Sequence, residues 1–362
     1  MSVLLMKIQP EKIERVVVRG VNWVGDAVMT VPALRELRRV LPQAQITLVT
    51  RPWAEGLFSG AEFLDELLIY ERRPRSLRAV ARQIRQWRSR RFDLALLFQN
   101  AFEAALIAGA AKVPVRIGYA TDGRRALLTH PLPVPGWRGE RHEIFYYLNI
   151  VAELERLLYG RSAIMEREPQ FALGVSEKRK KRAREFLSEQ GVKMDRPLVA
   201  LCPGSTNSRA KRWPAERYAI LADRFIEEAG ASVLLIGSPD ELEVSHEVQA
   251  RMKNEPIVLT GRTELEQAVG VLSLVDVLIT NDTGPAHIAS ALNRPTLVIF
   301  GPTDPRTTRP YPSVAEIIRH PPDCAPCMLR DCPIDHRCMT AITPEEVFAR
   351  ASALMKKGFA EV

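Results

Sequence analysis

The most informative segment of this chain reads Leu278-Ile-Thr-Asn-Asp-Thr-Gly-Pro-Ala-His-Ile-Ala-Ser-Ala-Leu-Asn-Arg-Pro-Thr-Leu-Val-Ile-Phe-Gly-Pro302. It begins with an apolar run that ends at Thr280 and closes with a second apolar run from Thr296 to Phe300. A polar turn and a stretch with helical spacing separate the two runs. The segment therefore predicts a strand, a short helix and a parallel strand, the repeating unit of an α/β sheet.

The polar turn of this segment has the composition of an anion site. Asp282 or Thr283 is expected to cap the helix, Gly284 permits a tight turn, and Pro285 suits the first helical position. A helix N-terminus presents backbone amides and the positive end of the helix dipole. His287, in the first turn, can add a donor. The alternative is a capped helix with no ligand, and the segment alone does not separate the two.

The rest of the chain repeats the alternation of strand and helix in two halves. A polar segment from about Tyr159 to Leu173 separates the halves, and a closing helix is predicted from Pro344 to Lys356. Strands are predicted at Arg15–Arg19, Gln45–Thr50, Leu67–Tyr70, Asp93–Phe98, Val115–Tyr119, Leu198–Cys202, Ser232–Ile236 and Ile257–Leu259. Two α/β halves predict a cleft, with ligands beyond the carboxyl ends of the strands.

Composition points to a globular protein with anionic partners. Hydrophobic residues make up 46% of the chain and charged residues 26%. No apolar run reaches the roughly 18 residues that cross a bilayer, and the first twelve residues lack a signal-peptide pattern, so we expect a cytoplasmic protein. The net charge is +8, and nucleic acid, anionic lipid headgroups and phosphorylated small molecules are all candidate partners.

Arginines are densest from Glu71 to Arg91, where apolar residues recur at helical spacing. This pattern predicts a surface helix with a basic face. Such a face is usually only solvated, and contact with a membrane surface or an acidic acceptor is the alternative.

Four of the five cysteines are close together in the sequence, at Cys324, Cys327, Cys332 and Cys338. Disulfides are not expected in a cytoplasmic chain of this size. The spacing can hold a metal, but it lacks the paired C-x2-C knuckles of a zinc ribbon. A packed, reduced loop is the alternative, and no metal site is assigned.

The first loop, Gly20-Val-Asn-Trp-Val-Gly-Asp-Ala27, has the glycine spacing of a phosphate-binding Walker A loop. It carries Asp26 where the lysine belongs, and a carboxylate there would repel phosphates, so a nucleotide triphosphatase is disfavoured. An acidic residue after a strand suits a general base for a hydroxyl nucleophile. The alternative is a charge that stabilises its own helix.

Two loops in the second half also follow strands. The loop Cys202–Pro214 offers small polar groups and then cations: Ser205, Thr206, Asn207, Arg209, Lys211 and Arg212. This composition suits a phosphate cradle. In the loop Gly237-Ser-Pro-Asp-Glu241, the carboxylate of Glu241 can accept from a ribose hydroxyl, and helix capping is the other explanation. With the turn at Asp282, these loops predict a nucleoside-diphosphate pocket.

Four motifs together resemble the lipopolysaccharide heptosyltransferases of glycosyltransferase family 9. They are Gly25-Asp26, Lys211-Arg-Trp-Pro214, Gly237-Ser-Pro-Asp-Glu241 and Asn281-Asp-Thr-Gly-Pro-Ala-His287. The resemblance covers nearly the whole chain. The cysteine run and the Asn22-Trp-Val-Gly-Asp26 loop favour one branch of the family.

The resemblance implies a GT-B fold: two Rossmann-like domains that face a central cleft. Residues 1–170 would bind the acceptor and residues 171–343 the nucleotide sugar, while the helix in residues 344–362 would cross back to the first domain. The implied reaction moves L-glycero-D-manno-heptose from ADP-heptose to the lipid A–linked inner core, with inversion and without a cofactor or metal. The implied location is the cytoplasmic face of the inner membrane, as a peripheral protein, and no nucleic-acid partner is expected.

The resemblance also implies residue roles. Asp26 would be the general base, and Lys211 would neutralise the departing diphosphate with help from Ser205, Thr206 and Asn207. Thr283, Gly284 and His287 would bind the same diphosphate, Asp282 would shape the turn or contact the heptose, and Glu241 would hold the ribose.

Three alternatives remain open from the sequence. One is a related family 9 enzyme with another nucleotide sugar or acceptor, and another is a GT-B epimerase that acts on a UDP-sugar. The third, from a different class, is a noncatalytic protein that binds nucleotides or nucleic acid. It accounts for the charge but gives Asp26 and the three-loop pocket no purpose.

Overall fold

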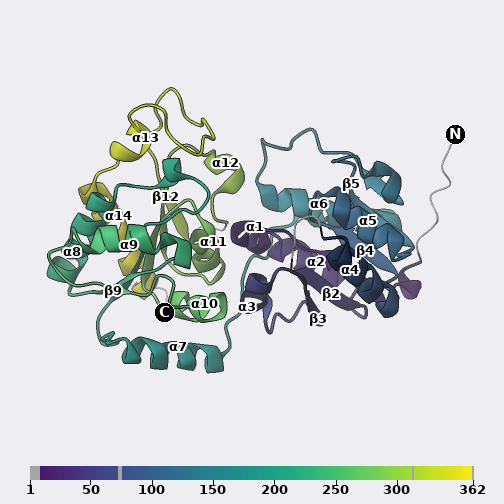
Figure 1. The fold of residues 1–362 in the computed structure, drawn as a ribbon, viewed down its shortest axis with the longest axis horizontal. Helices are drawn as coiled ribbons and strands as arrows, with labels where there is room; N and C mark the ends of the chain where they lie inside the picture. The colour runs from purple at the N-terminus through teal and green to yellow at the C-terminus, as the bar shows by residue number, and fades with distance from the viewer. Residues whose placement is uncertain (1–8, 72–75, 312–313, 361–362) are drawn as a thin grey trace. The chain divides into compact units, whose positions relative to one another are not determined.

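The computed structural model describes residues 9–71, 76–311 and 314–360. The chain divides into two compact units, Met1–Phe171 and Ala172–Val362, and each is built on a six-stranded parallel sheet (Figure 1). The prediction of two Rossmann-like α/β halves is therefore confirmed.

Strands and helices alternate along most of the described part of the first unit. Its strands are β1 (Arg15–Arg19), β2 (Gln45–Thr50), β3 (Glu66–Ile69), β4 (Leu94–Leu97), β5 (Val115–Tyr119) and β6 (His130–Leu132). Its helices are α1 (Val24–Met29), α2 (Val31–Val40), α3 (Glu55–Phe58), α4 (Leu77–Arg90), α5 (Phe102–Ala110) and α6 (Glu143–Tyr159).

The second unit begins with a helix and then repeats the same alternation. Its strands are β7 (Leu198–Cys202), β8 (Ser232–Leu235), β9 (Ile257–Val258), β10 (Val277–Asn281), β11 (Thr296–Ile299) and β12 (Ala315–Ile318). Its helices are α7 (Glu177–Glu189), α8 (Ala215–Ala229), α9 (Leu242–Gln249), α10 (Leu265–Leu272), α11 (Gly284–Ala291), α12 (Pro305–Thr308), α13 (Arg337–Thr340) and α14 (Pro344–Ala360).

The two sheets have the same topology. Their strand orders are β3-β2-β1-β4-β5-β6 and β12-β11-β10-β7-β8-β9. In each sheet the chain builds outward on one side and then returns to build on the other, so the direction reverses between β1 and β4 and between β7 and β10. Ligands of doubly wound sheets bind beyond the carboxyl ends of the strands at such a reversal.

Helices cover both faces of each sheet, which explains why the central strands are largely apolar. In the first unit α2 packs on α6 and α4 packs on α5, while in the second α8 packs on α9 and α14, and α10 packs on α7 and α11 (Figure 1). All four residues of β4 and all five of β7 are buried. A parallel strand covered on both faces requires such an uninterrupted apolar run.

Asp26 lies in the first turn of α1, which is the position that the alternative of a helix charge requires, and its role as general base stays a prediction. Strands β6 and β12 were not predicted. β6 contains Pro131, which counts against a strand but is tolerated because β6 is an edge strand.

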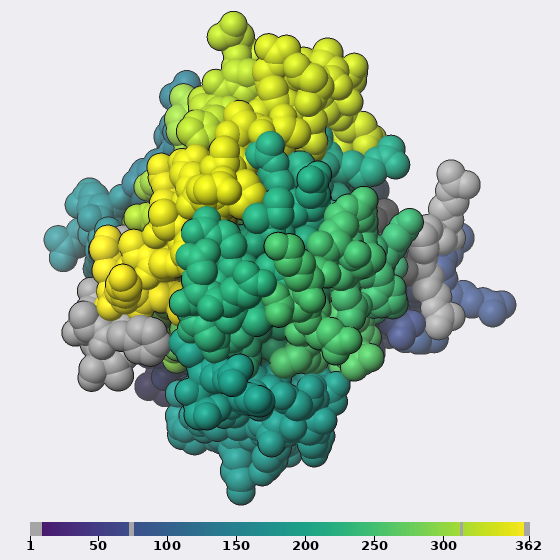
Figure 2. Space-filling model, turned by 90° about the vertical axis from the view of Figure 1, so that its left-hand side faces the viewer, coloured from purple at the N-terminus to yellow at the C-terminus, as the bar shows by residue number. Residues whose placement is uncertain are grey.

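Helix α14 packs on the second unit. Val347 and Ala351 are fully buried and Met355 is 7% exposed, in the same core as residues of β10, β11 and α8. Figure 2 shows the C-terminal segment (yellow) lying against the teal segment that includes α8. That the helix crosses back to the first unit stays a prediction.

Among the described residues, no helix combines the length and the apolar composition needed to cross a membrane.

Candidate active site

The three predicted donor loops of the second unit leave neighbouring strands. The loop from Pro203 to Arg212 follows β7, the turn at Asp282 follows β10, and the segment Gly237–Glu241 follows β8. Strands β10, β7 and β8 are adjacent in the sheet and parallel. Their carboxyl ends meet at one edge, so the structure brings these three loops together, at the reversal point between β7 and β10.

Lys211 and Asp282 form an ion pair across that reversal point. Lys211 Nζ lies 2.8 Å from Asp282 Oδ2 and donates to the Asp282 carbonyl oxygen at 3.2 Å. The Asp282 side chain is 5% exposed and that of Lys211 25%. The Thr303 hydroxyl, in the loop after β11, donates to the same Oδ2 at 2.8 Å. Asp282 is therefore a buried support that holds the ammonium group at the sheet edge.

The predicted side-chain cap of α11 is wrong. Thr283 occupies the N-cap position, but its side chain makes no capping hydrogen bond. Its hydroxyl lies 3.1 Å from the Thr280 hydroxyl and donates to the Asn281 carbonyl oxygen. The Asp282 carboxylate does not cap α11 either, because it pairs with the Lys211 ammonium instead.

Gly284 and His287 begin α11, at the positions expected. Gly284 is the first residue of the helix and is half-buried, while His287 is 4% exposed. A donor contact to His287 thus requires an approach through the first turn of α11, and its role stays a prediction.

Glu241 is bound by its own turn. Its Oε2 accepts from the Ser238 backbone amide at 2.8 Å, which is one half of a capping box, and also from the Ser238 hydroxyl at 2.9 Å. The residue is 7% exposed. A Cβ atom at Gly204 would lie 2.4 Å from the Glu241 carboxylate, so only glycine permits the β7 loop to approach this closely. The alternative of capping is therefore realised, and the ribose contact stays a prediction.

The loop after β7 presents part of its polar composition to solvent. Thr206 and Asn207 are exposed, whereas Ser205 is buried. Arg212 donates to the Ser205 carbonyl oxygen at 3.1 Å, and Arg209 pairs with Asp331 at 2.6 Å. These two arginines hold the loop, which leaves Lys211 as the cation of this loop that lies at the reversal point.

The cysteine segment supports the same loop from outside. The Ala210 amide donates to the Arg330 carbonyl oxygen at 2.9 Å, and the Ser208 hydroxyl donates to the Arg330 and Leu329 carbonyl oxygens. His336 Nε2 lies 2.6 Å from the Ala210 carbonyl oxygen. The segment around the cysteines therefore packs against the loop that carries Lys211 and is hydrogen-bonded to it.

All five cysteines are free thiols. Within residues 9–71, 76–311 and 314–360, no group of three or more His, Cys, Asp or Glu side chains is arranged to hold a metal ion. Burial raises the pKa of the Cys202 thiol to about 12, and burial also raises the pKa of Cys338. Cys202 is therefore a buried thiol at the end of β7 that stays protonated near neutral pH.

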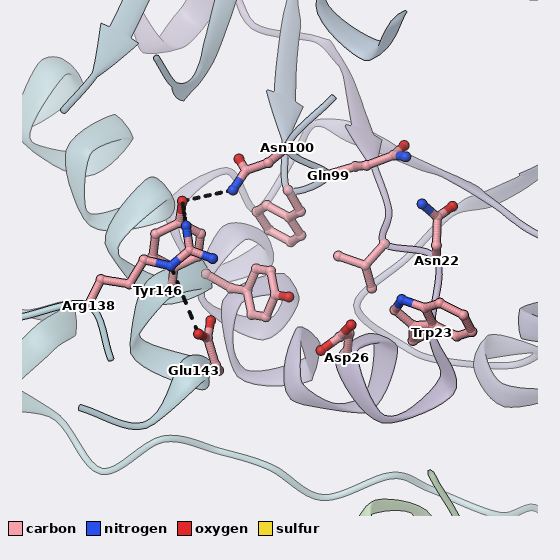
Figure 3. Close-up of a pocket in the computed structure, with 11 residues that line it drawn as sticks. Asn22, Trp23, Asp26, Gln99, Asn100, Arg138, Glu143 and Tyr146 are labelled. Atoms are coloured by element: carbon pink, nitrogen blue, oxygen red, sulfur yellow. Dashed lines mark hydrogen bonds and ion pairs between the residues drawn. The ribbon is translucent and has the colours of Figure 1, made fainter. Parts of the chain in front are cut away.

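The first unit has its own polar site at the reversal point between β1 and β4. A cavity of about 210 Å³ lies there. Its lining comes mainly from the segments that follow β1 and β4 and from α6: Val21, Asn22, Trp23, Asp26, Phe98, Gln99, Asn100, Arg138, Glu143, Tyr146 and Tyr147. Figure 3 shows the Asp26 carboxylate pointing into this pocket from α1. The predicted base thus lies in a pocket that can receive a small polar substrate.

One wall of this pocket is a hydrogen-bonded cluster around Tyr146. Its hydroxyl accepts from Asn100 Nδ2 at 2.8 Å and from Arg138 Nη1 at 3.0 Å (Figure 3). The Arg138 guanidinium lies over the Tyr146 ring, 4.1 Å from its centroid, and 4.0 Å from Glu143. The Tyr119 ring stacks on the Tyr146 ring at 4.0 Å.

Two buried arginines position the amides that follow β4. Arg19, 1% exposed, donates to Gln99 Oε1 at 3.0 Å, and Arg124, 0% exposed, donates to Asn100 Oδ1 at 2.7 Å. Burial lowers the pKa of both guanidinium groups. Since a buried arginine needs its donors paired, these contacts fix the two side chains that line the pocket.

Two ionisable groups of this pocket, Glu143 and Tyr147, lie in a partly desolvated setting. Burial raises the pKa of Glu143, opposed by the Arg138 charge. Burial also raises the pKa of Tyr147, and the nearby Asp26 charge adds to this rise. Tyr147 therefore stays a neutral phenol beside the candidate base.

Sequence reasoning missed Gln99, Asn100, Arg138, Glu143 and Tyr146. A signal existed for the first two, because a Gln-Asn pair directly follows a predicted strand, as the other site residues do. The other three belong to α6 and the segment before it, and α6 reaches the site by packing on α1, α2 and β5, which local sequence does not reveal.

Two doubly wound units with polar sites at their reversal points match the GT-B fold of glycosyltransferases. Residues 80–337 match the model of glycosyltransferase family 9 (heptosyltransferase). The chain belongs to this family.

Several relatives that the chain resembles are heptosyltransferases. The lipopolysaccharide heptosyltransferase 2 of Salmonella typhimurium is 31% identical over 84% of this chain and 88% of its own length. That of Escherichia coli is 29% identical over 94% of this chain and 98% of its own. The structure of E. coli ADP-heptose lps heptosyltransferase II superposes with a TM-score of 0.80 at 28% identity, over 95% of this chain and 99% of that one.

These matches confirm the predicted resemblance, including the branch that the cysteine run and the first loop favoured, heptosyltransferase II. They also confirm the predicted enzyme class. The alternatives raised from the sequence, including the noncatalytic nucleotide or nucleic-acid binding protein, are not favoured.

Proposed function

We propose that this glycosyltransferase moves a heptose from ADP-heptose to the inner core of lipopolysaccharide, with inversion and without an essential metal. The observation that carries the proposal is the Lys211–Asp282 pair at the reversal point of the second sheet, in a chain similar to heptosyltransferases 2 along most of its length. The relatives' names supply the heptose and the acceptor.

In this proposal, the second unit binds the donor. Lys211 neutralises the diphosphate. Thr206 and Asn207, which are exposed, and Ser205, which is buried, belong to the same loop and assist it. The start of α11, at Thr283, Gly284 and His287, provides the positive end of a helix dipole for the same diphosphate. Asp282 holds the Lys211 ammonium, and Glu241 orients the ribose at the neighbouring strand end. A diphosphate is a good leaving group once its charge is stabilised by groups that are already oriented.

The first unit would bind the acceptor. Asp26 takes the proton of the attacking hydroxyl, which is consistent with its place in a pocket lined by amides, an indole and a guanidinium. Attack from the face opposite the departing ADP inverts the anomeric carbon. The division into an acceptor part (1–170), a donor part (171–343) and a returning helix (344–362), with a cleft between the parts, belongs to this proposal.

A peripheral contact with the cytoplasmic face of the inner membrane is also proposed. Arg78, Arg82, Arg85 and Arg88 are exposed on α4, which presents a basic face suited to anionic headgroups. Flotation with vesicles that contain anionic lipid should recover the protein at low salt and lose it at high salt. Absence of flotation at low salt would refute the membrane contact and leave the transfer reaction untouched.

The reaction is tested by incubating the purified chain with ADP-heptose and heptose-terminated lipopolysaccharide core, with ADP-glucose and UDP-sugars in parallel. We expect ADP release and a product heavier by one heptose only with ADP-heptose and acceptor. Turnover of another nucleotide sugar would identify a related family 9 transferase, and isomerisation of a UDP-sugar without acceptor would identify an epimerase.

A further inference from the structure

Asn281, which immediately precedes Asp282, makes four side-chain hydrogen bonds. Asn281 ends β10 and is 0% exposed. Its Oδ1 accepts from the Trp213 backbone amide at 3.0 Å and lies 3.2 Å from the Tyr218 hydroxyl. Its Nδ2 donates to the Pro203 carbonyl oxygen at 2.8 Å and to the Gly204 carbonyl oxygen at 3.1 Å.

These contacts lie at both ends of one loop. Pro203 and Gly204 begin the loop after β7, and Trp213 ends it, just before α8. The residues between them include Ser205, Thr206, Asn207 and Lys211. The Asn281 side chain therefore closes the base of the loop that carries Lys211, while its own backbone leads directly into Asp282, the partner of Lys211.

The chemistry of the contacts requires a carboxamide. The two carbonyl oxygens need donors and the Trp213 amide needs an acceptor, so the orientation of the amide group is determined by its surroundings. An aspartate of the same size would keep the acceptor side but would place an oxygen against two carbonyl oxygens. An apolar residue would leave buried backbone groups unpaired, which is costly.

We infer that Asn281 is a positioning residue for donor binding: its carboxamide holds the Lys211 loop in register with the Asp282 turn. This inference rests on the proposed function, because it takes the Lys211 loop to be the diphosphate site. The effect is expected on donor binding, since the side-chain contacts of Asn281 described above all lie within the second unit.

Three variants of the full chain test the inference. Asn281→Asp reverses the polarity of two contacts, and Tyr218→Phe removes only the hydroxyl, whose single proton is shared between Asn281 Oδ1 and the Cys202 carbonyl oxygen at 3.3 Å. Asn254→Asp is the matched control, because Asn254 also donates from Nδ2, to Asp223 and Glu227, away from the donor loops. ADP affinity is measured by calorimetry, and KM is measured for donor and acceptor separately.

We expect Asn281→Asp to raise the ADP Kd and the donor KM by about 10-fold or more, the equivalent of at least one buried hydrogen bond. The acceptor KM should change by less than about twofold, and the Asn254→Asp control should bind ADP like the wild type. Tyr218→Phe should raise the ADP Kd by roughly threefold, and it decides the question if Asn281→Asp does not fold.

A lower melting temperature with unchanged ADP Kd and donor KM would overturn the inference, because it would assign Asn281 to folding alone. Equal rises in donor and acceptor KM would overturn it as well. If the wild type fails to bind ADP or to transfer heptose, the proposed function fails and the inference fails with it. A wild-type-like Asn281→Asp variant beside an active wild type would refute only the positioning role.

Discussion

Removing the Lys211 ammonium should have a large and interpretable effect. In Lys211→Ala the Asp282 carboxylate, 5% exposed, keeps only the Thr303 hydroxyl of the contacts described above, at 2.8 Å. Breaking a buried pair by removing one partner costs about 3–5 kcal/mol. Because the Lys211 side chain is 25% exposed and partly solvated, we expect a smaller loss of stability, about 1–3 kcal/mol.

The catalytic loss should exceed the loss of stability. The diphosphate loses its cation and meets an uncompensated carboxylate, so kcat/KM for ADP-heptose should fall by about 100- to 1,000-fold. Asp282→Asn leaves the cation but removes its anchor, and a fall of about 10-fold is expected. If Asp282 acts by holding Lys211, the double variant should be no slower than Lys211→Ala within about threefold, since the two effects are not additive.

The assay is ADP release with acceptor present, together with thermal unfolding of each variant. Lys180→Ala is the matched control, because Lys180 also forms an ion pair in the second unit, with Glu177 at 2.7 Å on the surface of α7. Its turnover should equal that of the wild type. A Lys211→Ala enzyme within threefold of the wild type would remove Lys211 from the site, and fully additive effects in the double variant would refute the anchoring role of Asp282.

Three further results are expected. Asp26→Asn should lower transfer by about 100- to 10,000-fold with ADP affinity unchanged; normal rates with bound acceptor would show that another group takes the proton. Because burial raises the folded-state pKa of Glu143, its ionisation costs stability as the pH rises through that pKa. Glu143→Gln should therefore raise the melting temperature at neutral pH, with a gain that shrinks toward pH 4; a pH-independent difference would contradict this sign. A thiol reagent should modify three of the five cysteines quickly in the native protein and reach Cys202 and Cys338 only after unfolding, because burial raises both thiol pKa values; rapid reaction of all five would contradict the packing.

Much of the fold could be predicted because its signals are local. The central strands of a covered parallel sheet carry nearly continuous apolar runs, and the runs at Val16–Val18 and Leu198–Cys202 show this directly. Strands β6 and β12 were missed because neither shows such a run: β6 contains Pro131, which an edge strand tolerates, and β12 contains Glu316.

The candidate site was predicted in part. Polar residues that follow a strand lie at the carboxyl end of the sheet whatever the topology, so Asp26, Lys211 and Asp282 were found from the sequence. Their relations were not, because Lys211 and Asp282 are 71 residues apart and meet only when β7 and β10 become neighbours.

The sequence by itself determined the α/β class, the two halves, the residues at the strand ends and the family. Each of these can be recognised from a short stretch of residue types, without knowledge of the strand order. Only the tertiary structure decided that Asp282 anchors Lys211 instead of capping α11, that Arg19 and Arg124 fix Gln99 and Asn100, and that Asn281 closes the Lys211 loop. The physical reason is that a buried polar group takes whichever partner the strand order brings within reach, and strand order is a property of the whole sheet.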